Sequence, residues 1–109
     1  MKRKPRSETK RSLERKQARA RERLAADRER LFELEAGGAP RVALQVPSPS
    51  VIDAHVSRVP CPRCEGKLEL LEQAAVTLDG VRLREARLKC RACGSPRSLW
   101  FRILSDTSN

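Results

Sequence analysis

Four cysteines arranged in two pairs are the residues of this chain best suited to chemistry. Cys61 and Cys64 form one C-x2-C pair, Cys90 and Cys93 form the other, and 25 residues separate the pairs. Each pair makes a tight turn that aims two thiolates at one point, so two such turns complete a tetrahedral shell of four sulfurs. Zn2+ favours that shell because it imposes no geometry of its own and binds soft thiolates. The spacing therefore predicts one structural zinc ion held by these four ligands.

Iron, disulfides and redox chemistry are the alternatives for four paired cysteines. The chain opens on basic residues with no apolar stretch after them, so we expect neither a secretory signal nor a transmembrane span. We therefore expect a cytoplasmic protein, and in a reducing compartment paired cysteines hold metal more often than they form disulfides. A thioredoxin-like site needs one C-x-x-C at a helix start in a βαβ unit, a pattern this chain lacks. These points favour zinc and leave iron as the other metal.

The chain is strongly basic for its size. Its 109 residues include 24 Lys and Arg against 14 Asp and Glu, a formal net charge of +10. Such a charge favours polyanionic partners, namely RNA, DNA or a nucleoprotein complex. A region of fewer than about 70 residues rarely builds a hydrophobic core large enough to fold without a disulfide or a bound metal. We therefore expect the metal to make folding of the cysteine region possible.

The first segment, 1–36, predicts one charged helix. Ser7 or Thr9 can serve as its N-cap, good helix formers follow, and a Gly-Gly pair ends it. Basic side chains dominate its N-terminal end and apolar ones gather at the other. This division predicts that the basic N-terminal end of the helix binds a polyanion and that its apolar C-terminal end binds a partner. The alternatives are a solvated helix without a partner and a helix that dimerises. The candidate nucleic-acid contacts are Arg11, Arg15, Lys16 and Arg19, and the candidate partner contacts are Leu31, Phe32 and Leu34.

The second segment, 37–58, is rich in Gly, Pro and Ser and predicts an extended linker without a packed core. Val42, Leu44 and Val46 share a period-2 face, so this stretch can also add an edge strand to the domain that follows.

The third segment, 59–104, predicts a small β domain around the cysteines, with a disordered tail at 105–109 after it. Asp79 and Gly80 lie between alternating apolar residues, which is the strongest short-range signal for a β-hairpin. The apolar phase changes after this turn, which predicts a bulge near Arg84 and Glu85. A final strand carries Leu99, Phe101 and Ile103 on one face and Trp100 and Arg102 on the other.

Two C-x-x-C turns, each followed by a glycine, joined by a hairpin and closed by a third strand, resemble a zinc ribbon. The resemblance covers about 59–104 and implies a three-stranded antiparallel sheet with Cys61, Cys64, Cys90 and Cys93 as zinc ligands. The whole chain is then a small α+β protein made of a long N-terminal helix, a linker and a C-terminal ribbon. Zinc ribbons serve transcription factors, polymerase subunits and ribosomal proteins, so the fold does not name the function. The ribbons of transcript-cleavage factors carry an Asp-Glu pair at the hairpin tip, and the Asp-Gly tip here argues against that activity.

A non-catalytic module that binds nucleic acid or a nucleoprotein machine is the function that the sequence favours. A shell of four cysteines leaves no open position on the metal, and the chain has no Gly-rich phosphate loop, so we do not expect an enzyme. The guanidinium group of arginine can donate two hydrogen bonds to phosphate oxygens, so the arginines of the ribbon are candidate nucleic-acid contacts. The alternative is that they pair with glutamates across the sheet. The ribbon candidates are Arg82, Arg84, Arg87, Lys89 and Arg91, with Arg97 and Arg102 in addition.

A protein–protein adaptor is the second hypothesis. Trp100 and the apolar end of the helix would then dock on a larger machine such as a polymerase or a ribosome. A membrane role is not expected, because the apolar face of the helix is narrow and its polar face mixes both signs of charge.

Overall fold

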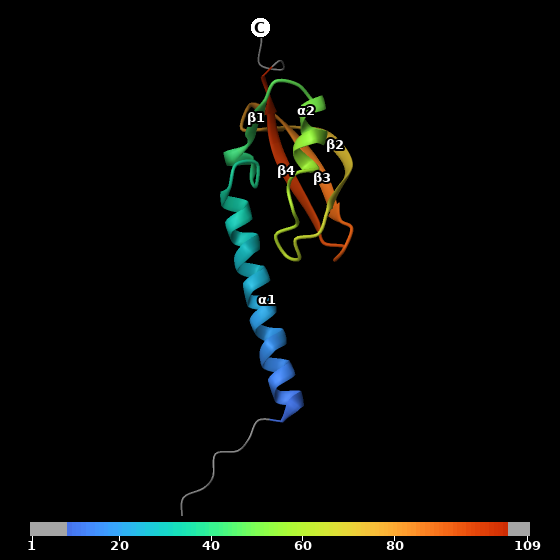
Figure 1. Ribbon diagram of the computed structural model, residues 1–109. Helices are drawn as coiled ribbons and strands as arrows, with labels where there is room; N and C mark the ends of the chain where they lie inside the picture. Colours follow the sequence, from blue (N-terminus) through green and yellow to red (C-terminus); the bar gives the residue numbers. More distant parts are fainter. Residues whose placement is uncertain (1–8, 105–109) are drawn as a thin grey trace, which may run out of the picture.

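A long helix leads into a small mixed sheet in the computed structural model, which describes residues 9–104 (Figure 1). This arrangement confirms the predicted fold class, a small α+β protein with a long N-terminal helix. The tail expected at 105–109 lies outside the described residues. The elements are α1 (Lys10–Leu34), the 3-10 helix η1 (Pro40–Val42), β1 (Leu44–Val46), α2 (Ser50–Val56), β2 (Leu68–Leu78), β3 (Val81–Cys90) and β4 (Pro96–Ile103).

The sheet has the strand order β1-β4-β3-β2. Strands β2, β3 and β4 are antiparallel, as the ribbon resemblance implies. Strand β1 runs parallel to β4, with Leu44 opposite Phe101 and Val46 opposite Ile103. The edge strand expected within 42–46 is therefore present, and it makes this sheet four-stranded.

Helix α1 begins and ends on local signals. The Thr9 hydroxyl accepts a hydrogen bond from the Ser12 backbone N–H at 3.1 Å, which caps the first turn. After the helix the chain folds back so tightly that a Cβ on Gly38 would lie 1.9 Å from the Phe32 carbonyl oxygen, so only glycine fits there. The Gly37 carbonyl then accepts a 2.7 Å hydrogen bond from the Trp100 N–H, which ties this turn to β4.

The segment 37–58 differs from the extended linker that its composition predicts. It contains η1, β1 and the two-turn helix α2, and it supplies Val46, Ile52 and Val56 to the core at 3%, 0% and 3% exposure. Ile52 and Val56 are four residues apart, so α2 presents both to the sheet on one face. Pro49 lies at the N-cap of α2, where a proline removes no intrahelical hydrogen bond.

The hairpin is confirmed, but the predicted bulge is wrong. Asp79 and Gly80 form a two-residue turn with φ of 50° and 76°, and Leu78 lies opposite Val81. Strand β3 pairs without interruption near Arg84, and the register shift lies in edge strand β2 instead, between Leu70 and Glu72.

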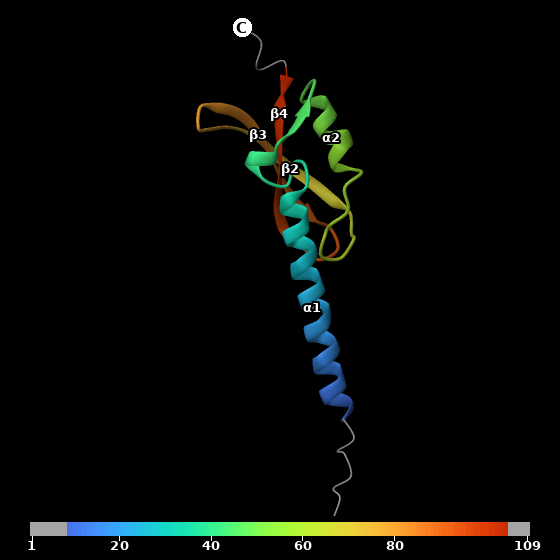
Figure 2. The same cartoon turned by 90° about the vertical axis from the view of Figure 1, so that its left-hand side faces the viewer.

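The change of apolar phase in β3 has a different cause from a bulge. Leu83 is buried on one face of the strand, whereas Ala86 and Leu88 are buried on the other. The face of Ala86 and Leu88 belongs to the core, which also holds Ile52 of α2. Leu83 lies on the opposite face, where it borders η1 and β1. Figure 2 shows the tip of the β2–β3 hairpin projecting away from the body of the sheet.

Candidate metal centre

The first cysteine pair lies on the loop between α2 and β2. The Cys61 N–H donates to the Gly66 carbonyl at 2.9 Å, and the Glu65 N–H donates to the Cys61 carbonyl at 2.8 Å. These two backbone hydrogen bonds close a tight turn, with Glu65 in the left-handed region at φ 63°. Cys61 is fully buried, while Cys64 is exposed at the outer side of the turn.

The second cysteine pair follows the same plan at the end of β3. The Cys90 N–H donates to the Ser95 carbonyl, and the Gly94 N–H donates to the Cys90 carbonyl, both at 3.0 Å. Here Gly94 takes the left-handed conformation, with φ of 76°. The Arg91 N–H donates to the Lys67 carbonyl at 2.9 Å, so backbone hydrogen bonding links the two turns directly.

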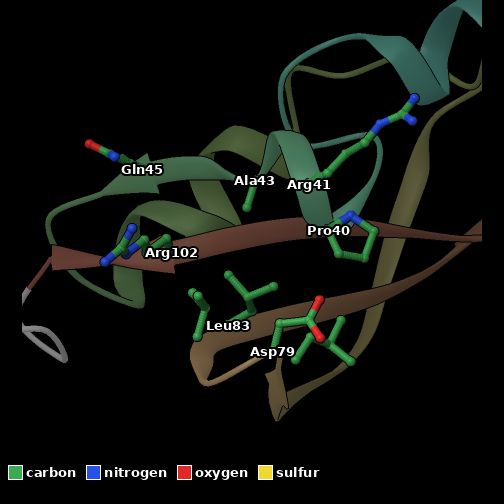
Figure 3. Close-up of a pocket in the computed structure, with 9 residues that line it drawn as sticks. Pro40, Arg41, Ala43, Gln45, Asp79, Leu83 and Arg102 are labelled. Atoms are coloured by element: carbon green, nitrogen blue, oxygen red, sulfur yellow. The ribbon is translucent and has the colours of Figure 1, made fainter.

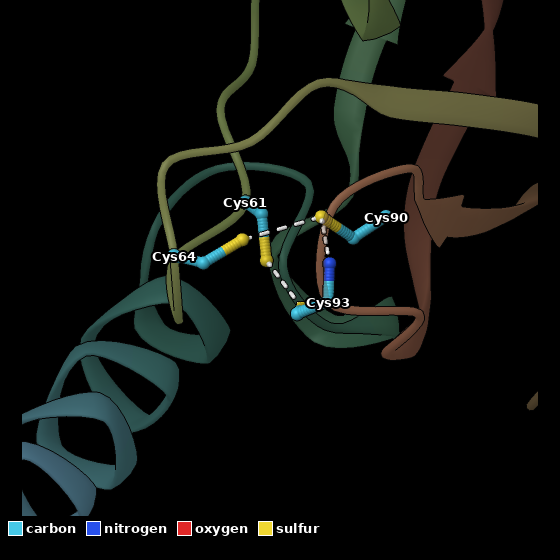
Figure 4. Close-up of side chains that lie close together, drawn as sticks. All are labelled: Cys61, Cys64, Cys90 and Cys93. Carbon is cyan, nitrogen blue, oxygen red and sulfur yellow. Dashed lines mark hydrogen bonds between the residues drawn. The ribbon is translucent and has the colours of Figure 1, made fainter.

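The two turns bring all four sulfurs together (Figure 4). Every pair of Sγ atoms lies within 4.8 Å, with 3.8 Å between Cys61 and Cys93 and 3.3 Å between Cys64 and Cys90. A Zn–S bond of about 2.3 Å places the sulfurs of a regular tetrahedron ~3.8 Å apart. All four thiols are free, so the cluster contains no disulfide. The cluster can therefore hold one metal ion.

Backbone N–H groups favour the thiolate form of these ligands. Cys90 Sγ accepts from the N–H groups of Ala92 and Cys93, and Cys64 Sγ accepts from that of Gly66, each at 3.4 Å. The Cys93 N–H is the main cause of a lowered pKa at Cys90. Such N–H donors offset part of the negative charge that four thiolates bring to one point.

The exposed sulfurs of the cluster ionise very differently. Cys93 Sγ lies 3.2 Å from Ser95 Oγ, and this hydrogen bond is the main cause that lowers the pKa of Cys93 to about 6. At Cys64 the Gly66 N–H favours the thiolate, but the neighbouring thiols, first that of Cys90, and burial together raise its pKa to about 12. The other cysteines of the cluster, Cys90, Cys93 and Cys61, all contribute to the raised pKa of Cys64. A metal ion that binds all four thiolates must therefore displace protons.

Gly66 lies where no larger residue fits. A Cβ at this position would lie 3.0 Å from Cys90 Sγ, 3.1 Å from Cys64 Sγ and 2.8 Å from the Cβ of Ala92. The two sulfurs belong to different turns, so Gly66 lies where the two halves of the cluster meet. Glycine is required at position 66 by space. At position 94 it is favoured by the left-handed backbone, which Glu65 adopts at the matching position of the first turn.

Two arginines and two glutamates form a charged group beside the cluster, and the sequence did not single out this group. Arg63, between the two cysteines of the first turn, donates to Glu22 and Glu29 of α1, the second contact at 3.1 Å. Arg97 of β4 donates to Glu29 at 2.8 Å and to Cys61 Sγ at 3.6 Å. Its side chain is 7% exposed, so Arg97 is not available as a phosphate contact. Glu29 and Arg97 are 68 residues apart, and no local pattern predicts such a contact.

The basic residues predicted on α1 are all accessible. The whole stretch 13–24 is exposed, and residues 10–23 carry seven basic side chains against two acidic ones. In both views the first half of α1 extends past the cysteine turns at the end of the sheet (Figures 1 and 2). The predicted contacts lying here are Arg11, Arg15, Lys16 and Arg19.

The ribbon candidates do not form one patch. Arg87 pairs with Glu72 at 2.5 Å and Glu85 at 3.3 Å, and Arg91 lies 3.9 Å from Glu69, so these two follow the alternative of pairing with glutamates. The remaining three divide between the two faces of β3 by strand alternation: Arg82 and Arg84 lie on one, and Lys89 on the other.

The predicted partner contacts are also divided. Phe32 packs against the core beneath Arg97, whose guanidinium carbon lies 5.5 Å from the centre of its ring. Trp100 is half-buried beside Phe32 around a pocket of about 280 Å³. Leu31 and Leu34, by contrast, are 60% and 62% exposed. Phe32 therefore attaches α1 to its own sheet, and Leu31 and Leu34 are the exposed members of the predicted partner contacts.

A pocket of about 500 Å³ lies on the Leu83 face of the sheet, between η1, β1 and the hairpin tip (Figure 3). Leu83 and Pro40 give it apolar walls. Figure 3 shows Arg102 at one end, Asp79 on the hairpin side and the Arg41 side chain directed away from the pocket. Its charged groups thus do not converge on one point as a binding site for a single anion requires.

Comparisons with protein families, with curated proteins and with solved structures found no match to this chain. The fold and the cysteine cluster therefore carry the functional argument. Within residues 9–104, no helix combines the length and the apolar character needed to cross a membrane.

Proposed function

We propose that this protein is a non-catalytic zinc module that binds nucleic acid through the exposed first half of α1. Zinc is the metal that best fits four cysteine sulfurs at tetrahedral spacing with backbone N–H donors around them. Four protein ligands leave no coordination position for a substrate or a water molecule, which supports a structural role and argues against an enzyme.

The observation that carries the nucleic-acid proposal is the basic surface of α1 beyond its contact with the sheet. Arg11, Arg15 and Arg19 follow one another at intervals of four residues, so they share one side of the helix about 6 Å apart along its axis. A row of guanidinium groups of this kind suits a phosphate backbone, because each fork can bind two phosphate oxygens. The contacts would be to the backbone, so we expect little sequence selectivity.

Salt dependence of binding tests this proposal. The zinc-loaded protein is titrated by fluorescence anisotropy against single-stranded and duplex RNA and DNA at several salt concentrations. Replacing Arg11, Arg15 and Arg19 together by Gln should lower the log–log salt slope by about 2–3, since each phosphate contact contributes roughly 0.7–0.9.

A second triple variant controls for the loss of charge. Arg41, Arg58 and Arg102 carry no ion pair among the described residues and lie outside α1, so their joint replacement by Gln removes the same charge elsewhere. We expect this control to keep most of the wild-type slope. Equal losses in the two triples would contradict a site on α1, and no binding at about 50 mM salt would refute the nucleic-acid proposal.

An adaptor function is the second candidate, favoured by one surface. Leu13, Leu24, Leu31 and Leu34 are 44–62% exposed. By helical periodicity they lie on the side of α1 opposite Glu29, which contacts the sheet. A double Leu24→Gln and Leu31→Gln variant should keep wild-type nucleic-acid binding if α1 acts through its arginines. Binding to a protein partner that is lost in this variant and depends weakly on salt would instead favour the adaptor.

A further inference from the structure

Helix α1 is held against the cysteine cluster by a group of charged side chains. Arg63 lies within the first cysteine turn and binds both Glu22 and Glu29. Arg97 lies on β4 beside the cluster and binds Glu29 from the other side. Glu29 therefore receives one arginine from each part of the metal centre, and it is the residue through which α1 contacts both.

Arg97 also contacts a metal ligand. Its guanidinium donates to Cys61 Sγ at 3.6 Å as well as to Glu29 at 2.8 Å, and it stacks over Phe32 of α1. The Nε atom is buried and has no hydrogen-bond partner among the described residues, so the position of this side chain is fixed by its two terminal contacts and by packing. One guanidinium thus bridges a ligand sulfur and the helix.

The charges explain why these contacts belong with a bound metal. A zinc ion with four thiolates carries a net charge of about −2, and a guanidinium beside a ligand sulfur offsets part of it. Burial raises the pKa of Glu29, but the hydrogen bonds from Arg97 and Arg63 outweigh this effect and lower it, so the carboxylate is charged. The guanidinium lies between a ligand sulfur and the Glu29 carboxylate, so an arrangement that orders the sulfur also orders the group that holds the helix.

We propose that Arg97 and Glu29 couple metal binding to the docking of α1, so that an occupied metal centre holds the helix in place and a docked helix strengthens metal binding. By thermodynamic linkage, each event must favour the other by the same factor. Arg97 and Glu29 act here as positioning residues of the metal centre, since neither is a ligand. The coupling rests on the proposed zinc site and is independent of nucleic-acid binding, although it would set the direction in which the basic half of α1 extends.

The test compares two charge-neutralising variants of α1 in the full chain. Glu29→Gln removes the carboxylate that both arginines bind. Asp27→Asn is the matched control, because Asp27 is exposed, lies on the opposite side of the helix and pairs only with Arg30 among the contacts described. Zinc affinity is measured by competition with a chromophoric chelator at fixed pH. We expect Glu29→Gln to weaken zinc binding at least about 5-fold, the lower end for coupled sites, and Asp27→Asn to stay within 2-fold of wild type.

A variant on the sheet provides the second arm of the test. In the structure one nitrogen, Arg97 Nη2, donates to both the sulfur and the carboxylate. Arg97→Lys keeps the charge but replaces the planar guanidinium with a compact ammonium on a shorter side chain, so we expect about 10-fold weaker zinc binding. Amide hydrogen exchange over residues 22–34 of the zinc-loaded proteins should be faster in Arg97→Lys and Glu29→Gln than in Asp27→Asn.

The possible outcomes separate the coupling from the metal assignment. Equal zinc affinity and equal exchange in all variants would overturn the coupling and leave the zinc site standing. A wild-type protein that binds no zinc would refute the metal assignment and the coupling with it.

Discussion

The substitution Gly66→Ala tests the geometry of the metal centre with a single added methyl group. The new Cβ would lie 3.0 Å from Cys90 Sγ and 3.1 Å from Cys64 Sγ, and 2.8 Å from the Ala92 Cβ. Ordinary contacts between such atoms are about 3.5–4.0 Å, so each neighbour is approached too closely by roughly 0.5 to 1 Å. Sulfurs bound to one metal ion cannot move apart freely, and the strain must fall on the metal site.

Overpacking of this kind costs about 1–3 kcal/mol. Because metal binding and folding are linked in small metal domains, we expect zinc affinity to fall about 5- to 150-fold. Competition with a chromophoric chelator measures the change, and the visible spectrum of the cobalt-substituted protein reports whether the site stays tetrahedral.

Gly80→Asn is the matched control for this substitution. Gly80 lies at the hairpin tip, where an added Cβ would have no atom within 4 Å, and asparagine tolerates its left-handed backbone. We expect zinc affinity close to wild type in this variant. If Gly66→Ala binds zinc as tightly as Gly80→Asn does, the four sulfurs are not arranged as described and the reasoning fails.

Two further predictions address acid stability and the packing of α2. The pKa of Cys93 is lowered from 9.0 to about 6, with the hydrogen bond from the Ser95 side chain as the first cause. This thiolate therefore contributes stability that is fully present above pH 9.0 and is lost as the pH falls through about 6. Ser95→Ala should therefore release zinc at higher pH than wild type in an acid titration with a zinc indicator. Ser98→Ala is the control, because the Ser98 hydroxyl donates to Glu85 away from the cluster, and this variant should release zinc at the same pH as wild type. Identical release curves for Ser95→Ala and wild type would contradict this role of Ser95. Ile52→Ala should lower the free energy of unfolding of the zinc-loaded protein by about 2–5 kcal/mol, since Ile52 is 0% exposed. Leu71→Ala is the control, because Leu71 is 59% exposed. If denaturant unfolding shows no larger loss in Ile52→Ala than in Leu71→Ala, α2 does not pack on the sheet.

The features that the sequence predicts correctly are encoded over a few residues. The Asp79-Gly80 turn and the helix cap at Thr9 each depend on neighbours within three or four positions. The two C-x2-C pairs are also local, and their meeting follows from the chemistry of a shared metal ion.

The features that sequence reasoning missed depend on contacts between distant residues. The proline-rich stretch before α2 indicates an extended chain, yet burial of Ile52 and Val56 on the sheet stabilises a helix directly after it. The contact between Glu29 and Arg97 joins α1 to β4 across 68 residues, and each residue alone is an ordinary charged side chain. Periodicity reports which side of an element is apolar, but it does not report which charged residue faces which in the folded protein.

X-ray absorption at the zinc edge of the zinc-loaded protein tests the central claim most directly. Cys61, Cys64, Cys90 and Cys93 as joint ligands predict one zinc ion per chain, with four sulfurs at about 2.3 Å and no nitrogen or oxygen neighbour in the coordination shell. Fewer than four sulfurs, a nitrogen or oxygen ligand, or no bound zinc would contradict a closed structural site.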